Sequence, residues 1–360
     1  MSKIVSIGTA VPEHKHDQSG ILEFMQTVYA LKEEEQRKIR FLYRQSGINT
    51  RYSVIPDYGI AAPGWEFYSP TENLEPFPSL EKRMQWYQKY APALSFQAVQ
   101  QCLAEQSDKK ITHLITVSCT GLSAPGLDLD LLEMLDLPAT TFRTSVNFMG
   151  CYAAVHALKI GDAFCRADAA ANVLIVCTEL CTLHFQNEPT IDNITSSMLF
   201  ADGAAAVLLS GNPEAEGLTI DRFFSKVASK GKKDMAWELS ATGFQMTLSS
   251  YVPDIIEAGF NELVTEALAA ADLEKSDITE WCIHPGGKKI LEAVHKSLGF
   301  SNGQLKPCYD VLRDYGNMSS ATLLFVLKEI MAALDKKEKH SIFAAAFGPG
   351  LTMETIILSA

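Results

Sequence analysis

The chain repeats one order of elements in its two halves, and this repeat limits the folds open to it. A polar turn, an apolar run and a glycine-containing loop occupy Ser107–Gly121, and the same order returns at Glu274–Gly287. Downstream of each, a glycine-marked turn leads into an apolar helical pattern, at Asn147–Gly161 and at Tyr315–Ile330. Each half then closes on a glycine turn and an apolar strand pattern. Strand–loop–helix units recur in unrelated α/β proteins, but the matched order of four elements favours an internal duplication.

The spacing of corresponding positions agrees with a duplication. From Ile111 to Cys151 is 40 positions, and from Ile278 to Ser319 is 41. We therefore expect two similar halves, residues 1–212 and 213–360, divided at the polar, turn-forming stretch Gly211–Glu216.

The apolar runs are typical of strands that are buried on both faces. Continuous β-branched runs separated by helical patterns predict a layered α/β fold. The clearest runs are Ile4–Val11, Ile111–Val117, Val173–Val176, Ala204–Leu209, Ile342–Ala346 and Thr355–Leu358. The proline- and aromatic-rich segment 52–84 reads as a loop excursion before a helix at Ala93–Glu105.

Composition excludes several classes of protein. The formal net charge of −12 argues against non-specific nucleic-acid binding, which needs a basic surface. Eight cysteines lie mostly in apolar runs without a CxxC pair, so we expect a reducing, cytoplasmic setting. No apolar stretch reaches the roughly 20 residues that span a bilayer, and the N-terminal run reads as a strand. The spacing of Cys177, Cys181 and His184 matches no zinc pattern, so we expect no metal site.

Cys151 is the first candidate for chemistry. It follows Phe148-Met149-Gly150 and precedes the apolar helical pattern Tyr152–Ile160. The N-terminus of a helix lowers the pKa of a thiol and favours the nucleophilic thiolate. A buried, inert cysteine is the alternative, and it is the commoner fate of a single cysteine.

Two residues of the second half are its candidate partners. His284 ends the strand pattern Trp281–Ile283 and begins the loop Pro285-Gly286-Gly287, whose glycines allow close approach of a ligand. Asn317 lies in the turn before the helical pattern Ala321–Ile330, the counterpart of the turn that carries Cys151. Each has a structural alternative, a histidine satisfied by a carbonyl and an asparagine N-cap. If the halves pack about a pseudo-two-fold axis, all three residues meet near the centre.

A Cys–His–Asn set fits two chemistries. In the first, His284 pairs with Cys151 as thiolate and imidazolium, and the thiolate accepts an acyl group. His284 and Asn317 then donate hydrogen bonds to a thioester carbonyl and stabilise the enolate left by decarboxylation of a malonyl thioester. In the second, the set is a cysteine hydrolase in which the asparagine orients the histidine. The central position of Cys151 in a duplicated fold opposes the hydrolase.

At these residues the chain resembles the type III polyketide synthases of the chalcone synthase superfamily. The matching stretches are GCYAAVHAL at Cys151, LFADGAAAVL at Leu199, HPGGKKILEAV at His284, YGNMSSATLLFVL at Tyr315 and FGPGLTMETIIL at Phe347. They occur in the family's order and cover most of the chain. The resemblance implies the thiolase fold, a duplicated αβαβα layered architecture, working as a homodimer on coenzyme A thioesters without a permanently bound cofactor.

The resemblance also implies roles for individual residues. Cys151 would carry the starter and the growing chain, and His284 and Asn317 would be the decarboxylation and oxyanion donors. Phe200 matches the phenylalanine at the gate between the CoA tunnel and the cavity, although a core aromatic fits the same position. The Gly348-Pro349-Gly350 turn matches the loop that shapes the cyclisation cavity, and Ser319 is placed among the substrate-binding residues.

Departures from the family's pattern leave two assignments open. The family loop starts with a glycine where this chain has Ala346, and the second gate phenylalanine falls near both Phe244 and Met246. Plant-type enzymes bind the CoA phosphates through basic residues of an early helix. Arg44 and Arg51 are the candidates here, with a solvated helix face as the alternative.

The pocket residues suggest a substrate class. Cys119, Thr120, Ala124 and Cys181 match positions that line the acyl pocket of bacterial relatives, and all are small or slim. These small residues leave room for a long apolar chain. Bacterial relatives with this pattern use long-chain fatty acyl starters and make alkylpyrones or alkylresorcinols, so the resemblance implies the same starter and product class here. The alternatives are a malonyl-CoA-only tetrahydroxynaphthalene-type synthase, a ketoacyl-ACP synthase III, the cysteine hydrolase and a catalytically silent binding module.

Overall fold

The computed structural model describes the chain except residues 30, 72–73, 107–108, 229–230 and 302. Thirteen strands are assigned in the described part: β1 Lys3–Ala10, β2 His14–Asp17, β3 Thr50–Ser53, β4 His113–Ser118, β5 Phe142–Asn147, β6 Asn172–Leu180, β7 Asp202–Ser210, β8 Leu218–Val227, β9 Met235–Ser240, β10 Gly243–Leu248, β11 Glu280–Ile283, β12 Ser341–Gly348 and β13 Thr352–Ser359.

The α-helices of the described part alternate with these strands. They are α1 Gln18–Val28, α2 Glu33–Gln45, α3 Leu80–Leu103, α4 Leu127–Met134, α5 Ala153–Ala167, α6 Ile191–Leu199, α7 Val252–Ala269, α8 Lys288–Leu298, α9 Lys306–Tyr315 and α10 Thr322–Ala333. Short 3-10 turns occur at η3 Cys181–His184, η6 Ser319–Ala321 and η7 Pro349–Leu351.

The two halves of the main sheet share one topology. In the first half β4 runs parallel to β6, which pairs antiparallel with β7, which pairs antiparallel with β1. In the second half β11 runs parallel to β12, which pairs antiparallel with β13, which pairs antiparallel with β8. The halves join through β1 and β8 at only two residue pairs. β5 extends the first half at the edge and has no counterpart among the described strands of the second. We propose the division of the chain at residues 212 and 213, in the connection between β7 and β8.

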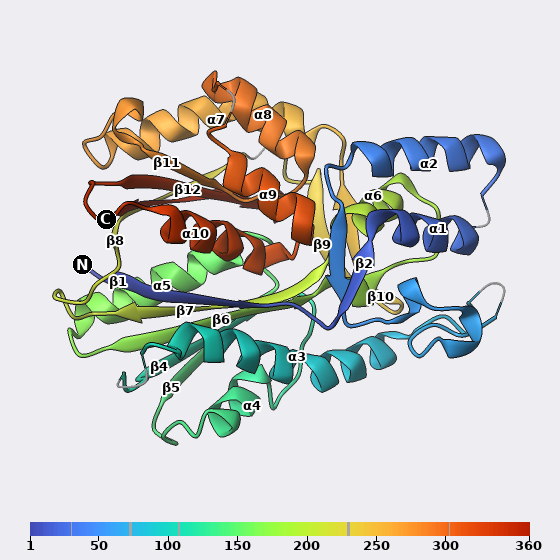
Figure 1. Ribbon diagram of the computed structural model, residues 1–360, viewed down its shortest axis with the longest axis horizontal. Coiled ribbons are helices and arrows are strands. Elements are labelled where there is room, and N and C mark those ends of the chain that lie inside the picture. Colours follow the sequence, from blue (N-terminus) through green and yellow to red (C-terminus); the bar gives the residue numbers. More distant parts are fainter. Residues whose placement is uncertain (30, 72–73, 107–108, 229–230, 302) are drawn as a thin grey trace.

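Five layers are visible in the molecule (Figure 1). α3 packs on the outer face of the first half, and α7 and α8 cover the second half. α5 and α10 form the central layer, since α5 contacts β6 and β13 and α10 contacts both β7 and β12. The apolar sequence of α10, buried from Thr322 to Leu327, is typical of a helix surrounded by protein. This is the duplicated thiolase fold that the repeat and the family resemblance indicate.

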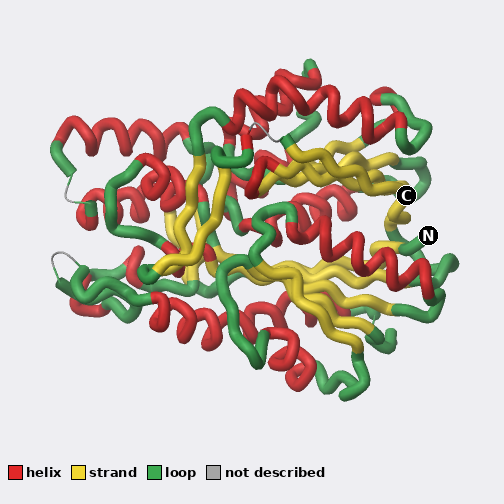
Figure 2. The backbone as a smooth tube through the Cα atoms, turned by 180° about the vertical axis from the view of Figure 1, so that it is seen from behind, coloured by secondary structure: helices red, strands yellow, loops and turns green. Residues whose placement is uncertain are grey.

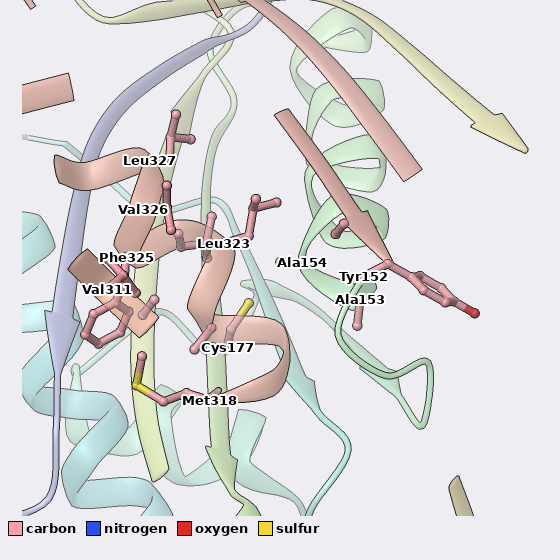
Figure 3. Close-up of a cluster of buried hydrophobic side chains, with 14 of the residues drawn as sticks. Tyr152, Ala153, Ala154, Cys177, Val311, Met318, Leu323, Phe325, Val326 and Leu327 are labelled. Carbon is pink, nitrogen blue, oxygen red and sulfur yellow. The ribbon is translucent and has the colours of Figure 1, made fainter. Parts of the chain in front are cut away.

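The starts of the two central helices belong to one hydrophobic cluster. Figure 3 shows Ala153 and Ala154 of α5 in the same region as Met318, Leu323 and Val326 of the α10 segment. Both termini lie at one end of the molecule, and the small sheets β2–β3 and β9–β10 lie toward the other, near α1, α2 and α6 (Figure 2). The start of α5 is therefore held in the interior, between the two halves.

The segment before α3 differs from its prediction. Residues 52–84 were expected to form a loop, but α3 begins at Leu80 and includes Pro92. Ser79 starts the helix, because its hydroxyl accepts a hydrogen bond from the backbone N–H of Lys82 at 3.2 Å. A proline inside a helix removes one backbone hydrogen bond, and packing of α3 against β1 and β7 compensates for this loss. The predicted start of this helix at Ala93 was therefore wrong, because the helix continues through Pro92.

Candidate active site

Cys151 lies at the start of α5. The residue before it, Gly150, has a backbone conformation that favours glycine. Gly150 has φ +81°, and a Cβ there would lie 2.2 Å from Cδ of Pro349. The turn thus brings Pro349 of the second half against the nucleophile's loop, at a separation that a side chain would prevent. Cys151 itself is 8% exposed and lines the main cavity.

Asn317 and Ser319 approach the Cys151 thiol from the second half. Burial raises the pKa of the Cys151 thiol to about 11, against the lowering effect of the Ser319 and Asn317 side chains. The prediction that the helix start alone lowers this pKa is therefore wrong, because desolvation penalises the charged thiolate. Ser319 adopts φ +49°, an uncommon conformation for a residue with a side chain and one typical of functional sites.

His284 ends β11 with both ring nitrogens free of hydrogen-bond partners. Its backbone N–H donates to the carbonyl of Ala345 at 2.8 Å, which fixes the residue, while the ring is 1% exposed and lines the main cavity. Burial lowers the pKa of His284 to about 3, so its single N–H of the neutral ring is available as a donor. An unpartnered buried polar group is costly and calls for a functional explanation.

Asn317 connects the cavity to the backbone at Phe200. Its Nδ2 donates to the carbonyl of Gly286 at 3.2 Å, and its Oδ1 accepts from the backbone N–H of Ser319 at 2.9 Å. The second N–H of the amide stays available, because an amide nitrogen carries two. The backbone of Asn317 pairs with Phe200 in a parallel bridge, with the Ala201 N–H donating to the Asn317 carbonyl at 2.8 Å.

One cavity of about 450 Å³ brings the three residues together. Cys151, His284 and Asn317 share its lining with several residues that the family resemblance assigned to substrate binding: Phe200, Cys119, Thr120, Cys181, Ser319 and Pro349. A second cavity of about 40 Å³ adjoins it and shares Cys181, Phe200, Trp237 and Met246. Met246 and Phe200 both line the main cavity. Phe244 is fully buried and lines only the small cavity.

Some predicted site residues lie elsewhere. The loop turns away from the cavity after Gly121. Ala124 is therefore exposed and does not line the cavity. Gly348 and Gly350 flank Pro349 in its turn without lining the cavity. Arg44 is exposed on α2, beside the lining residue Gln45.

Arg51 is a correction. Its guanidinium donates to the carbonyls of Ser197 and Phe200 at 2.7 and 2.6 Å and to Gln18 Oε1 at 2.9 Å, in a fully buried position. Arg51 therefore holds the backbone at Ser197 and Phe200 from the interior, and it does not reach a CoA phosphate. The prediction failed because a basic residue in a polar sequence gives no sign of burial.

Glu179 is a site-supporting residue that the sequence interpretation missed. Its Oε2 accepts hydrogen bonds from the Cys119 N–H and the Thr120 hydroxyl, both at 2.9 Å, and its Oε1 accepts from Ser320 of the second half. Burial raises the pKa of Glu179 to about 7, against the opposing effect of these bonds. The available signal was one carboxylate at the end of the apolar run from Val173, a place where a charge needs partners.

His184 of η3 and Trp237 of β9 fix the same cavity wall. The Nε2–H of His184 donates to the Thr120 carbonyl at 2.8 Å, and its Nδ1 accepts from the Phe244 N–H at 3.1 Å, so the ring is a neutral Nε2 tautomer. It stacks on Phe244 with ring centroids 4.2 Å apart. Trp237 donates to the Cys119 carbonyl at 2.7 Å. His184 therefore supports the wall and does not enter the main cavity.

No metal or membrane site emerges from this geometry. In the described ranges, no group of three or more His, Cys, Asp or Glu side chains is placed to hold a metal ion. None of the helices in the described part is long and apolar enough to cross a membrane.

A layered, duplicated thiolase fold with a cysteine, a histidine and an asparagine in one buried cavity defines an acyl-transferring condensing enzyme. Family models place the chain more closely. Residues 1–213 match the N-terminal domain of chalcone and stilbene synthases, and residues 223–360 match the C-terminal domain. The chain belongs to this family, and it is a type III polyketide synthase by class.

Individual relatives agree with the family. The chain is 31% identical over 371 residues to "Probable polyketide synthase 1" of Dictyostelium discoideum, covering 99% of this chain but 11% of that much longer protein. It is 30% identical over 362 residues to the "Alpha-pyrone synthesis polyketide synthase-like Pks18" of Mycobacterium tuberculosis, covering 98% of this chain and 90% of the relative. The crystal structure of PKS-I from the brown alga Ectocarpus siliculosus superposes with a TM-score of 0.91 at 28% identity, over 99% of this chain and 97% of that one.

Proposed function

We propose that the protein loads an acyl-CoA starter onto Cys151 and extends it with malonyl-CoA by decarboxylative Claisen condensation. The observation that carries the proposal is His284, a buried histidine with two unpartnered ring nitrogens in the same cavity as a buried cysteine. A buried hydrogen-bond donor without a partner is the arrangement that stabilises a developing oxyanion.

In the loading step, the Cys151 sulfur attacks the carbonyl carbon of the starter thioester. The thiol proton passes to His284, which forms a transient thiolate–imidazolium pair, and the pair's mutual attraction offsets the burial cost of each charge. The carbon–sulfur bond to CoA then breaks, and CoA leaves as a thiol with that proton. The starter remains on Cys151 as a thioester.

In the extension step, malonyl-CoA binds with its thioester carbonyl toward His284 and Asn317. Loss of carbon dioxide leaves an enolate, whose oxygen accepts hydrogen bonds from the neutral His284 ring and the free Asn317 N–H. The enolate carbon attacks the Cys151 thioester and expels the sulfur, so the lengthened chain is transferred to CoA. No base has to remove a carbon-bound proton, because decarboxylation supplies the electron pair.

We favour a long-chain fatty acyl starter and alkylpyrone or alkylresorcinol-type products. The cavity lining beyond Cys151 is mostly apolar, and Cys119, Thr120 and Cys181 leave room along one wall. The small cavity shares Cys181, Phe200 and Met246 with the main one, so further space lies beside it. The name of the mycobacterial relative, with its α-pyrone chemistry, supports the same product class.

A starter series tests the proposal. The enzyme is incubated with malonyl-CoA alone and with acyl-CoA starters from acetyl to palmitoyl, and products are identified by mass. We expect products that carry the long starters plus malonyl-derived two-carbon units. A product from malonyl-CoA alone would favour the tetrahydroxynaphthalene-type synthase, and a single condensation that needs malonyl carrier protein would favour ketoacyl-ACP synthase III. Absence of malonyl incorporation would refute the class of reaction.

The contacts of Asn317 argue against the cysteine hydrolase. In that mechanism the asparagine orients the histidine through a hydrogen bond, but Asn317 donates to the Gly286 carbonyl and His284 has no side-chain partner. Hydrolysis of peptides in the absence of CoA thioesters would revive this alternative.

We propose that two chains assemble through the edge strand β5. It ends the order of the main sheet, and Phe142 on it is 70% exposed, with Leu122 and Met134 exposed in neighbouring loops and helix. An unpaired edge with apolar side chains is suited to pair with a second copy. A molar mass of one chain, measured by light scattering at micromolar concentration, would contradict the homodimer.

We propose a cytoplasmic location. All eight cysteines are unpaired and buried, which suits a reducing compartment.

A further inference from the structure

The turn that carries Asn317 lies between the ends of two helices, because α9 ends at Tyr315 and α6 ends at Leu199. The backbone N–H of Asn317 donates to the Leu199 carbonyl at 2.9 Å, and the Asn317 carbonyl accepts from the Ala201 N–H at 2.8 Å. The place of the Asn317 amide in the cavity therefore depends on what holds these two helix ends.

The end of α6 is held by Arg51 of β3 and Gln18 of α1. The last carbonyls of a helix have no intrahelical donors and need partners from elsewhere. Nη1 of Arg51 donates to the Ser197 and Phe200 carbonyls. Nε2 of Gln18 donates to the Met198 carbonyl at 2.9 Å. Nε of Arg51 also donates to Oε1 of Gln18 at 2.9 Å, so the two side chains act as one unit.

The end of α9 is held by the two residues before Arg51. The backbone N–H of Asn49 donates to the Arg313 carbonyl at 2.8 Å. The Thr50 hydroxyl donates to the Asp314 carbonyl at 2.8 Å. Three consecutive residues, 49–51, thus fix the backbone on both sides of the turn.

The stem of Arg51 also contacts the turn directly. Gly316 has φ +70°, and a Cβ there would lie 2.9 Å from both Cγ and Cδ of Arg51. The same Cβ would lie 3.1 Å from the Leu199 carbonyl oxygen. Gly316 directly precedes Asn317, so a displacement of the Arg51 side chain would displace the amide.

The burial of Arg51 calls for an explanation, because the side chain is 3% exposed and takes part in none of the ion pairs found between described residues. A buried charge without a partner is costly. A guanidinium, however, presents its N–H donors in a rigid fork. One arginine can therefore hold two carbonyls and a side-chain amide in a fixed relation, which a single neutral donor cannot.

We propose that Arg51 is a positioning residue of the reaction, which holds Asn317 where its amide donates to the enolate oxygen. The inference rests on the proposed function, because it concerns a donor of the decarboxylation step. A displacement of about 1 Å at a reacting group can cost about 10²-fold in rate. Loading of the starter uses Cys151 and His284, so the loss of Arg51 should slow decarboxylation and spare loading.

Two half-reactions measure this difference. Loading is followed as single-turnover release of CoA from the starter, and decarboxylation as release of labelled carbon dioxide from malonyl-CoA. Arg51→Met keeps most of the stem and removes the donors. Its kcat for decarboxylation should fall about tenfold, while KM and the loading rate change less than about twofold. Arg51→Lys keeps a charged donor and should recover part of the loss.

A double-mutant cycle tests whether Arg51 acts through Asn317. If it does, Arg51→Met should cost nothing further in an Asn317→Ala background, and the double variant should decarboxylate as fast as Asn317→Ala alone. Losses that multiply in the double variant would overturn the proposal. An unchanged kcat in Arg51→Met, or equal losses in loading and decarboxylation, would overturn it too. A wild type that decarboxylates no malonyl-CoA would refute the proposed function instead.

Arg83→Met is the matched control. Arg83 of α3 is also fully buried, and its guanidinium donates to the backbone carbonyls of Pro78 and Leu183, which do not belong to the Asn317 turn. Any effect of this variant should be the same on loading and on decarboxylation, and it should multiply with that of Asn317→Ala.

Gln18→Met takes the place of Arg51→Met in the cycle if that variant does not fold. It removes the donor to the Met198 carbonyl and the acceptor of Arg51 Nε, while the buried charge stays in place. A loss of decarboxylation that disappears in the Asn317→Ala background supports the proposal. A loss that persists there, or no loss at all, overturns it.

Discussion

The two halves of the molecule build corresponding turns and use them for opposite purposes. After β4, the loop at Cys119 and Thr120 is held by Glu179, His184 and Trp237, and every one of these contacts is made within the protein. After β11, the corresponding loop begins with His284, whose ring makes no hydrogen bond. In the proposed mechanism, one half is a fixed wall that carries the nucleophile, and the other keeps the His284 ring free for a substrate.

The comparison teaches how a duplicated fold divides labour. The turns before α5 and α10 both contain a glycine at positive φ, Gly150 at +81° and Gly316 at +70°. In the proposed mechanism, the first turn positions the sulfur that carries the chain, and the second positions the amide that faces the developing negative charge. The pseudo-symmetry brings both to one cavity, while the side chains make the site asymmetric.

Replacing His284 by alanine should have the largest effect. Removing an oxyanion donor from a dry site costs about 10³-fold in rate, so malonyl-CoA decarboxylation should fall by that order. Cys151→Ala should retain decarboxylation, because the donors remain, but should form no chain-extended product. Release of labelled carbon dioxide and product mass separate the two variants. Full decarboxylation by His284→Ala would end the proposed division between the halves.

Asn317→Ala should reduce decarboxylation less, by about 10²-fold, because one donor remains on His284. The matched control is Asn261→Ala, on α7, where the residue is exposed and lines neither cavity. Steady-state decarboxylation is the measurement. An unchanged rate in Asn317→Ala would assign Asn317 a role as a turn residue only.

Glu179→Gln should change the pH dependence of stability. Burial raises the pKa of Glu179 in the folded protein to about 7, above its ordinary value of 4.5. The folded state therefore keeps its full stability below pH 4.5 and loses stability as the pH rises toward 7. A glutamine carries no charge, so its stability does not fall over this range. The free energy of unfolding of the variant, relative to wild type, should therefore rise by about 2 kcal/mol between pH 5 and pH 7. Denaturant unfolding at both pH values measures the difference. A constant difference would show that Glu179 stays ionised throughout.

The two turn glycines allow the finest comparison. Both glycines have positive φ, where alanine is strained, and a Cβ at residue 150 would lie 2.2 Å from the rigid Pro349 ring. At residue 316 it would lie 2.9 Å from the Arg51 side chain. Gly150→Ala should therefore be more destabilising than Gly316→Ala, by about 1 kcal/mol, measured by thermal unfolding. If Gly316→Ala is the more destabilising variant, the buried Arg51 side chain accommodates an added Cβ less well than the Pro349 ring does.

The regular parts of the fold could be read from the sequence because their signals are local. The apolar runs at Ile111 and Val173 became β4 and β6, and the apolar pattern after Cys151 became α5. The start of α3 was missed, since Pro92 carries a local signal that tertiary packing overrides. Ala124 and Arg51 were misplaced for the same reason, because burial is a property of distant neighbours.

The sequence by itself determined the duplication, the cysteine, histidine and asparagine, and the family to which they belong, because periodicity and turn residues act over a few positions. Only the tertiary structure decided which groups are desolvated. It raised the pKa of Cys151 and Glu179, left His284 without a partner, and turned Arg51 inward. Desolvation and hydrogen bonding between segments far apart in sequence have no local pattern, so the chemistry of the site emerges only when the two halves pack together.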